Sequence, residues 1–481
     1  MVYNAIDLFA GCGGMTEGLF AAGYKVVAAV EIDHNAARTY RVNHEQRKVV
    51  LYEADIRQVN PDNIRQLLGD EPLHLLAGCP PCQGFSTMRR KNKRGAKRDT
   101  RNRLVWEYVR FVEALMPITI MLENVPALAE YTEFKRAVAR LKRSGYIISY
   151  KSVNVAHYGV PQRRKRLVLV GSLLGALEPA AGNNRTVTVR ATIGNMPLPQ
   201  ESNDPLHRML PHHTAQIQEQ IRLTPHDGGS RLDLPERYIL PCHRKEGIGF
   251  KDVYGRLAWD KVSSTITGGC LNPSKGRFLH PEQDRCISAR EAAMLQTFPQ
   301  KYIFPTDLPR SAIALMIGNA LPPAFCKIQA KTIAEHLDGV FMADIFDEDK
   351  RSEIMRKVKN KNTTPELMVR KLLCEMGYGH YRLQSKSLPC RPDIIYPGRR
   401  KAIFVNGCFW HGHECGRGRL PEANHNFWEE KIHRNIVRDQ ENYTHLEALG
   451  WTVLVIWQCE IKMSNREQLV DKLRRFMEQN Q

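Results

Sequence analysis

The stretch DLFAGCGGMTEGL, residues 7–19, sets a glycine-rich turn between an apolar strand and the start of a helix. Gly11, Gly13 and Gly14 let the backbone bend sharply and approach a ligand closely. Such a turn also occurs where a strand simply joins a helix, so alone it is a weak indication of a binding site. Its strand–turn–helix order predicts the opening unit of an α/β fold.

Apolar runs continue to alternate with helical patterns as far as residue 171, which predicts a mainly parallel sheet with helices on both faces. Residues 172–283 lose this rhythm and are rich in Pro, His, Gly and Arg, the composition of a loop-rich insertion or of a small separate domain. Helices are expected at 15–22, 104–115, 132–144, 288–296 and 311–337.

An acidic segment, DGVFMADIFDEDK at 338–350, marks the major boundary. We expect a first domain over residues 1–340, with a core (1–171 and 284–340) around the inserted region 172–283. A linker over 341–350 and a second domain over 351–481 follow. In the second domain the patterns predict helices at 351–358, 365–376 and 426–449, and strands at 392–396, 401–406 and 451–457.

The chain has 481 residues, a net charge of +19 and twelve cysteines. From Asp344 onward 24 basic side chains meet 19 acidic ones, so most of the basic excess lies before that point. This excess favours a polyanionic partner such as nucleic acid. No window reaches the ~20 uncharged apolar residues of a membrane span, and no signal-peptide core opens the chain. The scattered cysteines favour reduced thiols, catalysis or metal binding over disulfides, so we expect a cytoplasmic protein.

Acidic residues stand at the ends of the next two expected strands. Glu31 ends the strand AAVEID, and Asp55 follows the next strand in EADI. Together with the glycine-rich turn, they predict a nucleoside ligand at the carboxyl edge of the sheet, where Glu31 would accept hydrogen bonds from ribose hydroxyls.

Cys82, in GCPPCQGFS at 78–86, is the candidate nucleophile at this edge. It follows a rigid Pro-Pro pair at the end of the strand LHLLAG. Residues 89–103 then hold nine Lys or Arg and one Asp. A run of this kind is often only a solvated loop, but beside a candidate nucleophile it favours contact with a phosphate backbone and an activated thiolate.

Over about residues 3–337 the chain resembles the DNA cytosine-5 methyltransferases. The resemblance rests on six motifs in the family's order: DLFAGCGG, GCPPCQGFS, ENV at 123–125, QRRKR at 162–166, SAREAAMLQTFP at 288–299 and GNALPP at 318–323. It implies a Rossmann-like, S-adenosylmethionine-dependent methyltransferase that acts on double-stranded DNA, with residues 172–283 as its target-recognition region.

The family's chemistry explains these residue types. Cytosine C5 is a poor nucleophile until the Cys82 thiolate adds to C6. The resemblance implies that Glu123 hydrogen-bonds N3 and the exocyclic amine, and that Arg164 and Arg166 hold the base O2 and a nearby phosphate. The base must leave the stack to reach the thiolate, which costs roughly a few kcal/mol. The implied cofactor-binding residues are Phe9, Gly11, Gly13, Gly14, Glu31, Ile32, Asp55, Ile56 and Asn319.

The stretch FVNGCFWHGHEC, residues 404–415, holds two cysteines and two histidines. Cys408, His413 and Cys415, with Cys459 after the strand VLVIWQ, offer the thiolate and imidazole ligands of a closed tetrahedral zinc site. On the residues alone His411 is ambiguous, since it could replace His413 as a ligand or act as a general base.

Asp393, in CRPDII, precedes two expected strands, as in the first half of a nuclease site whose carboxylates hold Mg²⁺. The usual second half, an acid-x-Lys, is absent, because Val405, Asn406 and Gly407 stand there. The residues alone therefore disfavour a nuclease of that general class.

Residues from about 350 to 462 resemble the very-short-patch-repair endonucleases, which nick DNA next to the T of a T:G pair. The shared motifs are TPEL, LPCRPDI, GCFWHGHEC and GWTVLVIW followed by Cys459. The resemblance implies a small restriction-endonuclease-like α/β domain with a structural zinc on the four ligands, and His411 as the base. Some relatives carry Thr and His at positions 405 and 406, where this chain has Val and Asn.

The same resemblance implies that Asp393 and the Val405 carbonyl bind Mg²⁺, with Glu366 assisting nearby. Phe409 and Trp410 would wedge into the base stack, with Met355 entering from the other groove. Core packing is the competing interpretation of Phe409 and Trp410.

Three hypotheses follow for the second domain. A mismatch nuclease would repair the T:G pairs that deamination of 5-methylcytosine leaves at the first domain's own sites. A restriction-type nuclease would cut unmethylated DNA, and an inactive zinc-stapled domain would only bind DNA. We favour the first: a bifunctional enzyme of the bacterial cytoplasm, monomeric and associated with the nucleoid through DNA. Mismatch-repair or restriction proteins are further candidate partners.

Overall fold

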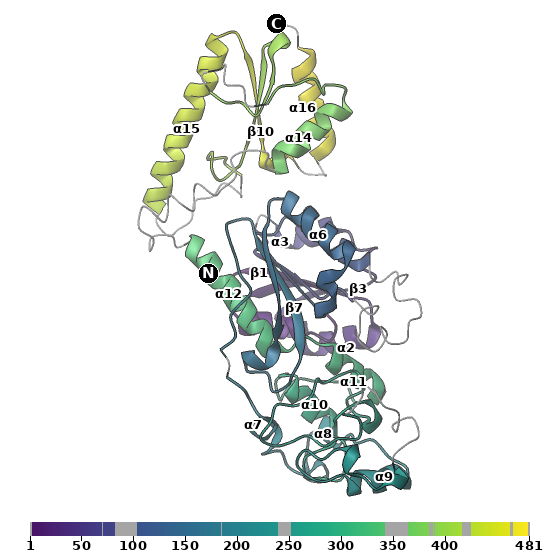
Figure 1. The fold of residues 1–481 in the computed structure, drawn as a ribbon. Coiled ribbons are helices and arrows are strands. Elements are labelled where there is room, and N and C mark those ends of the chain that lie inside the picture. The colour runs from purple at the N-terminus through teal and green to yellow at the C-terminus, as the bar shows by residue number, and fades with distance from the viewer. Residues whose placement is uncertain are drawn as a thin grey trace.

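The computed structural model describes residues 2–69, 71–81, 103–183, 185–238, 252–341, 364–383, 388, 390–415, 425–461 and 465–479. Within them a seven-stranded sheet organises the first domain (Figure 1). Its order is β3-β2-β1-β4-β5-β7-β6, and its strands are β1 (Asn4–Leu8), β2 (Lys25–Glu31), β3 (Val50–Glu53), β4 (Leu75–Gly78), β5 (Thr119–Asn124), β6 (Ile147–Asn154) and β7 (Lys165–Ser172). The strands from β3 to β5 run parallel, and β7 is antiparallel to both of its neighbours. The expected α/β class and largely parallel sheet are confirmed.

β1 and β4 are neighbours at the point where the chain changes direction across the sheet. From β1 the chain moves outward to β2 and β3, whereas from β4 it moves to β5 on the other side. Connections that leave the carboxyl ends of two such strands diverge and open a crevice, where ligands bind in open α/β sheets. The glycine-rich turn follows β1 and therefore lies at this crevice.

Helices cover both faces of the sheet because strand side chains point alternately to the two faces. Ile6 and Leu8 belong to a hydrophobic cluster with α3 (Pro61–Leu68), α5 (Leu104–Leu115) and α6 (Thr132–Arg143). Ala5 belongs to a second cluster with α1 (Gly14–Ala21) and α12 (Pro323–Phe341). α2 (His34–His44) packs Tyr40 against Ala29.

The single helix expected over 311–337 is wrong. α11 (Arg310–Asn319) ends before Pro322, and α12 begins at Pro323. Proline lacks the amide hydrogen that a helix needs and its ring clashes with the preceding turn, so two prolines in succession break a helix that the apolar pattern would continue. The expected helices corresponding to α1, α5, α6 and α10 (Ala289–Leu295) are confirmed to within one residue at each end.

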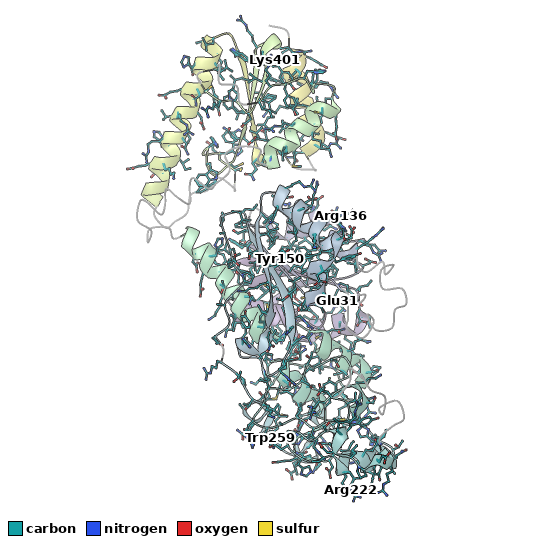
Figure 2. All side chains as sticks on the ribbon, in the orientation of Figure 1. Glu31, Arg136, Tyr150, Arg222, Trp259 and Lys401 are labelled. Carbon is teal, nitrogen blue, oxygen red and sulfur yellow. The ribbon has the colours of Figure 1, made fainter. Side chains whose placement is uncertain are left out.

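The described part of the inserted region consists of short helices and turns, as its composition predicts: α7 (Val189–Ile193), α8 (Pro205–Arg208) and α9 (Ala215–Leu223). One hydrophobic cluster joins α7 and α8 to α10 and α11, whereas α12 packs on the sheet. Trp259 belongs to the former cluster, and the Arg190 guanidinium lies 5.3 Å from its ring centroid (Figure 2).

The stretch Arg310–Gly339 is the one part of the described chain whose length and apolar composition would allow a membrane span. Of its most apolar window, 56% is buried inside the fold. This apolar content is therefore used largely for packing, through α11 in the cluster of the inserted region and α12 on the sheet.

The second domain contains, among its described residues, a three-stranded sheet in the order β10-β9-β8, formed by β8 (Ile394–Tyr396), β9 (Lys401–Asn406) and β10 (Thr452–Trp457). β9 and β10 are parallel, and β8 is antiparallel to β9. Figure 1 shows α15 (His425–Ala448) on one face, and α14 (Thr364–Glu375) with α16 (Arg466–Glu478) on the other. The expected helix at 351–358 lies outside the described residues; the other expected elements of this domain are confirmed.

Packing on both faces of this sheet is hydrophobic. Ile394 and Ile403 pack against α14 and α16, and Ala402 packs with Leu446 of α15. Lys401 (Figure 2) is only 3% exposed. Its Nζ donates to the carbonyl oxygens at the end of α16, those of Phe476 (2.5 Å), Met477 (3.0 Å) and Gln479 (2.8 Å). A cation at a helix C-terminus is favourable, so Lys401 ties α16 to the sheet.

Candidate functional site

The glycine-rich turn after β1 is shaped for the close approach of a ligand. Gly11 and Gly13 have φ angles of +57° and +95°, which residues with a Cβ rarely adopt. Phe9 also has a positive φ of 61°, an uncommon conformation that is often found at functional turns. α1 begins at Gly14, so its first backbone N–H groups lie at the same crevice.

Glu31, at the end of β2, is tied to this turn (Figure 2). Its Oε2 accepts a hydrogen bond from the backbone N–H of Gly11 at 2.7 Å, and its Oε1 accepts one from the N–H of Asp33 at 2.7 Å. Burial raises the pKa of Glu31, and these backbone N–H groups oppose the shift. The carboxylate is thus held beside the turn, in a position suited to a ribose.

The other expected cofactor residues differ in exposure. Ile32 is 64% exposed and is therefore not a core residue. Ile56 is 4% exposed and packs in the core. The Asp55 carboxylate accepts from the Arg57 Nε at 2.9 and 3.0 Å. Asn319 is exposed at the end of α11.

Segments from the far end of the first domain pack directly against the turn. A Cβ on Gly13 would lie 2.4 Å from the ring of His44 and 2.5 Å from the Tyr302 hydroxyl. A Cβ on Gly14 would lie 2.6 Å from the carbonyl oxygen of Leu321. The turn and the GNALPP segment, more than 300 residues apart in sequence, therefore meet at one edge of the sheet.

Glu123, at the end of β5, lies beside β4 and is 7% exposed. Its Oε1 is 2.6 Å from the Nε of Arg166 on β7. Burial raises the pKa of the Cys79 thiol, and the negative charge of Glu123 raises it further. A buried carboxylate held by a guanidinium at this crevice can present a fixed hydrogen-bonding edge to a base. Cys82 lies outside the described residues, as does the basic run up to residue 102.

Arg164 joins three parts of the first domain. It is 3% exposed, and its guanidinium donates to the carbonyl oxygens of Ile266 (2.8 Å) and Ala320 (3.4 Å). Gln162 also binds Ile266, through its Oε1, which accepts from the backbone N–H at 3.1 Å. Burial lowers the pKa of Arg164, and the charge of Arg166 lowers it further. The sheet, the inserted region and the GNALPP segment thus meet beside Glu123.

In the second domain, the ligand atoms of Cys408, His413, Cys415 and Cys459 all lie within 4.8 Å of one another. The Sγ of Cys459 is 3.5 Å from the Nδ1 of His413. Zinc bonds of about 2.3 Å to sulfur and 2.0 Å to nitrogen place tetrahedral ligands roughly 3.3–3.8 Å apart, so the set fits a zinc ion after small adjustments. Burial and the neighbouring thiols raise the pKa of Cys408 to about 12, a shift that a bound cation would reverse.

His411 stands apart from these four residues. Its Nδ1 is hydrogen-bonded to the Oδ2 of Asp439 on α15, a residue that the sequence reasoning missed. A carboxylate on one ring nitrogen fixes the orientation and the tautomer of a histidine, which leaves the other nitrogen for a water molecule. The pair has the arrangement of an oriented general base.

Asp439 belongs to a row of three polar side chains on α15. The Nδ2 of Asn435 donates to the carbonyl oxygen of Trp410 at 2.9 Å, and the Tyr443 hydroxyl accepts from the Nδ2 of Asn406 at 2.8 Å. Positions i, i+4 and i+8 share one face of a helix, so this α15 row contacts the segment 406–411 along its length. In the sequence, only the four-residue spacing of positions 435, 439 and 443 could have indicated this row.

Asp393, just before β8, accepts a hydrogen bond at Oδ2 from the backbone N–H of Val405 at 2.8 Å. Burial raises the pKa of Asp393 to about 6, and the negative charge of Glu366 acts in the same direction. Glu366 is 3% exposed and pairs with Arg370 at 2.8 Å. A divalent cation would relieve the repulsion between these carboxylates, so the residues fit a Mg²⁺ site. Arg370 was also missed from the sequence.

Phe409 and Trp410 form an edge-to-face pair, with ring centroids 5.1 Å apart and an interplanar angle of 82°. Trp410 is 37% exposed, and neither residue belongs to the hydrophobic clusters of the described second domain. This position argues against core packing. Met355 lies outside the described residues.

Two family models match successive parts of the chain. Residues 3–335 match the sequence model of the C-5 cytosine-specific DNA methylases. Residues 343–417 match that of the DNA mismatch endonuclease Vsr.

Individual relatives agree with this division. The Type II methylase M.HgiDII of Herpetosiphon aurantiacus is 36% identical over 356 residues, which cover 71% of this chain and 97% of the relative. The Type II nicking enzyme V.XorIIP of Xanthomonas oryzae pv. oryzae is 48% identical over 120 residues, 25% of this chain and 88% of the relative. A crystal structure of a prophage-encoded E. coli protein assigned as a DNA modification methyltransferase has a TM-score of 0.51 at 24% identity, over 70% of this chain and 99% of that chain. This last match supports the fold of the first domain.

Proposed function

The chain belongs to the C-5 cytosine-specific DNA methylases and carries a Vsr-type mismatch endonuclease domain behind the methylase, and from this premise we propose a bifunctional DNA enzyme. Its first activity transfers the methyl group of S-adenosylmethionine to C5 of cytosine within one duplex sequence. Its second activity nicks DNA at the T:G mismatches that deamination of 5-methylcytosine leaves in that sequence.

For methyl transfer, the buried Glu123–Arg166 pair, which joins β5 to β7, carries the proposal. The Cys82 sulfur bonds to C6 of the extruded cytosine and pushes an electron pair into the ring. Glu123, kept in place by Arg166, donates its proton to N3 as negative charge develops there, and takes it back when the ring is restored. Arg164 lies near the base O2. S-adenosylmethionine supplies the methyl group that C5 takes. Loss of the C5 proton and of the Cys82 sulfur then restores the ring.

For nicking, the oriented His411–Asp439 pair close to Asp393 supports the proposal. The His411 nitrogen that does not face Asp439 takes a proton from the attacking water, whose oxygen bonds to phosphorus as the bond to the leaving deoxyribose oxygen breaks. Asp393 and Glu366 would hold Mg²⁺ with the Val405 carbonyl, and this ion supplies Lewis-acid chemistry at the phosphate.

Two further features fit a nuclease that recognises a weak base pair. Phe409 and Trp410 offer apolar rings outside the core, which could enter the base stack. Zinc bound to Cys408 and the three other ligands would hold the segment that carries Phe409 and Trp410 in a fixed conformation.

The word that the first domain methylates is the starting point of the test. Full-length protein is incubated with S-adenosylmethionine and unmodified genomic DNA, and bisulfite sequencing identifies the word. Duplexes that carry T:G or C:G at that word are then offered with Mg²⁺. We expect a nick in the T strand of the T:G duplex alone. Cleavage of both strands of the unmodified C:G duplex would instead identify a restriction nuclease.

Two single variants control for each other in this test. Cys82→Ser is expected to abolish methylation and to keep nicking. Asp393→Ala is expected to abolish nicking and to keep methylation. Loss of both activities in either variant would contradict the assignment of one activity to each domain.

A further inference from the structure

Tyr443, the last member of the α15 row, has a hydroxyl hydrogen available to donate at the nuclease site. Its oxygen already accepts a hydrogen bond from the Nδ2 of Asn406 at 2.8 Å. In the part of the chain that the structure describes, the hydroxyl hydrogen has no acceptor. The hydrogen bond from Asn406 thus holds the phenol oxygen in place, and the hydroxyl can still donate a hydrogen bond to a ligand.

The groups around this hydroxyl belong to the cluster assigned above to cleavage. Asn406 is 5% exposed and follows Val405, whose N–H binds the Asp393 carboxylate. The charges of Asp439 and Asp393 both act on the phenol. The ring of Phe404 packs edge-on against Tyr443, with centroids 4.9 Å apart, so that the phenol has a fixed orientation.

The charge of the cluster explains what a phenol can add there. The side chains of Asp393, Asp439 and Glu366 all end in carboxyl groups. Because a phosphodiester is also a negatively charged acceptor, its binding among them requires hydrogen-bond donors. Tyr443 can donate without adding negative charge. Burial raises the pKa of Tyr443 to about 12, although the hydrogen bond from Asn406 acts in the opposite direction. The hydroxyl therefore keeps its proton at neutral pH.

We infer that Tyr443 is a catalytic residue of the nuclease domain, whose hydroxyl, held by Asn406, donates a hydrogen bond to a non-bridging oxygen of the phosphate that is cut. This bond strengthens as negative charge grows on that oxygen during the attack of water, and no proton leaves the phenol. Asn406 acts through Tyr443 and is a positioning residue. Asn406 lies in the segment 405–407, where other nucleases have the acid-x-Lys motif. The Asn406–Tyr443 pair would supply there the hydrogen-bond donor that the lysine otherwise provides. The inference rests on the proposed nicking function.

Tyr443→Phe removes the hydroxyl and keeps the ring packed on Phe404. We expect the single-turnover rate of nicking a T:G duplex in Mg²⁺ to fall about 100-fold, as for the loss of one donor to a developing oxyanion. The Kd for the same duplex without metal should change by less than about twofold, because the bond matters mainly in the transition state. Asn406→Ala should lower the rate less, and the double variant should be no slower than Tyr443→Phe.

Tyr396→Phe is the matched control. It also removes one tyrosine hydroxyl, which donates to the carbonyl oxygen of Tyr378 at 2.7 Å, at the end of β8 away from Asp393. This variant is expected to nick at the wild-type rate and to lose stability comparable to that lost by Tyr443→Phe. Equal nicking rates for the two variants would overturn the inference.

Phosphorothioate duplexes separate a contact to the phosphate from a structural role. Sulfur is a weak acceptor, so sulfur in place of the contacted oxygen removes the benefit of the hydroxyl. One of the two stereoisomers should slow the wild type about tenfold more than it slows Tyr443→Phe; equal slowing of both proteins by both isomers would overturn the inference. If the wild type nicks the T:G duplex and Tyr443→Phe nicks it at the same rate, the inference about Tyr443 is overturned and the proposed function stands. A wild type that nicks no T:G duplex built on its own methylated word overturns both.

Discussion

Asp439 on α15 is hydrogen-bonded to the Nδ1 of His411, although 28 positions separate the two residues in the sequence. The carboxylate is 14% exposed and the imidazole 25%, so the pair is partly shielded from water. Because three of the four proposed zinc ligands lie in the same short segment as His411, this contact distinguishes the histidine that can take a proton from the one that can hold a metal.

Asp439→Asn keeps the shape of the side chain and removes its charge. The His411 ring then loses the partner that sets its tautomer, so nicking should fall about 10- to 100-fold while methylation is unchanged. Asp471→Asn is the control, since Asp471 is exposed on α16 and pairs with Arg474. Single-turnover nicking rates at pH 7 measure the effect. An Asp439→Asn variant as fast as Asp471→Asn would exclude the pair from catalysis.

Asp393→Asn should stabilise the metal-free second domain at neutral pH while abolishing nicking. The pKa of Asp393 is about 6 in the folded protein, against an ordinary value of 3.8, so the folded state binds this proton more tightly. The stability that the folded state gains by binding this proton is therefore fully present below pH 4. It is lost as the pH rises to about 6 and stays lost at higher pH. The difference corresponds to at most about 3 kcal/mol in the free energy of unfolding.

Urea denaturation of Mg²⁺-free protein, prepared identically for the wild type and the variant, at several pH values between 4 and 7 tests this. The wild type should lose stability across that range relative to Asp393→Asn, which cannot titrate at this position. Mg²⁺ should stabilise the wild type at pH 7 and leave the variant unaffected. Parallel pH profiles for the two proteins would contradict the prediction.

Cys408→Ser should release the zinc ion. Cys408 is the fully buried member of the set, so its loss leaves three partners around an open position. Metal analysis should show loss of stoichiometric zinc, and the second domain should unfold at a lower temperature while methylation is retained. Zinc affinity should also weaken as pH falls, because the thiols must lose protons to bind it. Cys374→Ser, at an exposed cysteine outside the set, should keep its zinc.

Arg166→Met should impair both methylation and stability. It leaves the Glu123 carboxylate buried without its cation, which costs about 3 kcal/mol in the free energy of unfolding. Adding Glu123→Gln removes the uncompensated charge, so the double variant should regain most of the stability but none of the activity. Denaturation curves and methyl incorporation measure the two effects. Full stability of Arg166→Met alone would show that the pair is not energetically coupled.

Gly318→Ala should destabilise the first domain. A Cβ at this position would lie 2.1 Å from the backbone N of Gly268 and 2.1 Å from the backbone C of Thr267, and neither atom can move without the segment that carries it. Gly339→Ala in α12 is the control, because nothing lies within 4 Å of its Cβ and alanine favours a helix by about 0.5–1 kcal/mol. Thermal denaturation should shift in opposite directions for the two variants.

The sequence predicted the elements of both domains better than their arrangement. Strands and helices follow local patterns, so β9 and α5 have their expected bounds. The insertion of β7 between β5 and β6 depends on pairing between distant segments, which local pattern does not record. The break at Pro322 was missed because the apolar pattern continues on both sides of it.

The site residues divide in the same way. Three of the four zinc ligands fall within eight residues and form a motif that can be read directly. Asp439 and Tyr443 lie on a polar helix, and their partners are 28 and 37 positions away. Only the folded helix, which places every fourth residue on one face, brings them to the motif.

The attachment of the inserted region beside Glu123 uses main-chain atoms of that region. Gln162 and Arg164 bind the N–H and the carbonyl of Ile266, and the backbone of Ser263 exchanges hydrogen bonds of 2.9 Å with Pro161 and Arg163. Such a joint depends on the path of the backbone, with Ile266 fully buried in a hydrophobic cluster. Residues elsewhere in the inserted region can therefore change while the region stays joined to the sheet beside Glu123. Engineered exchanges of the inserted region should stay folded where they preserve the backbone of 263–266 and the buried side chains of Ser263 and Ile266.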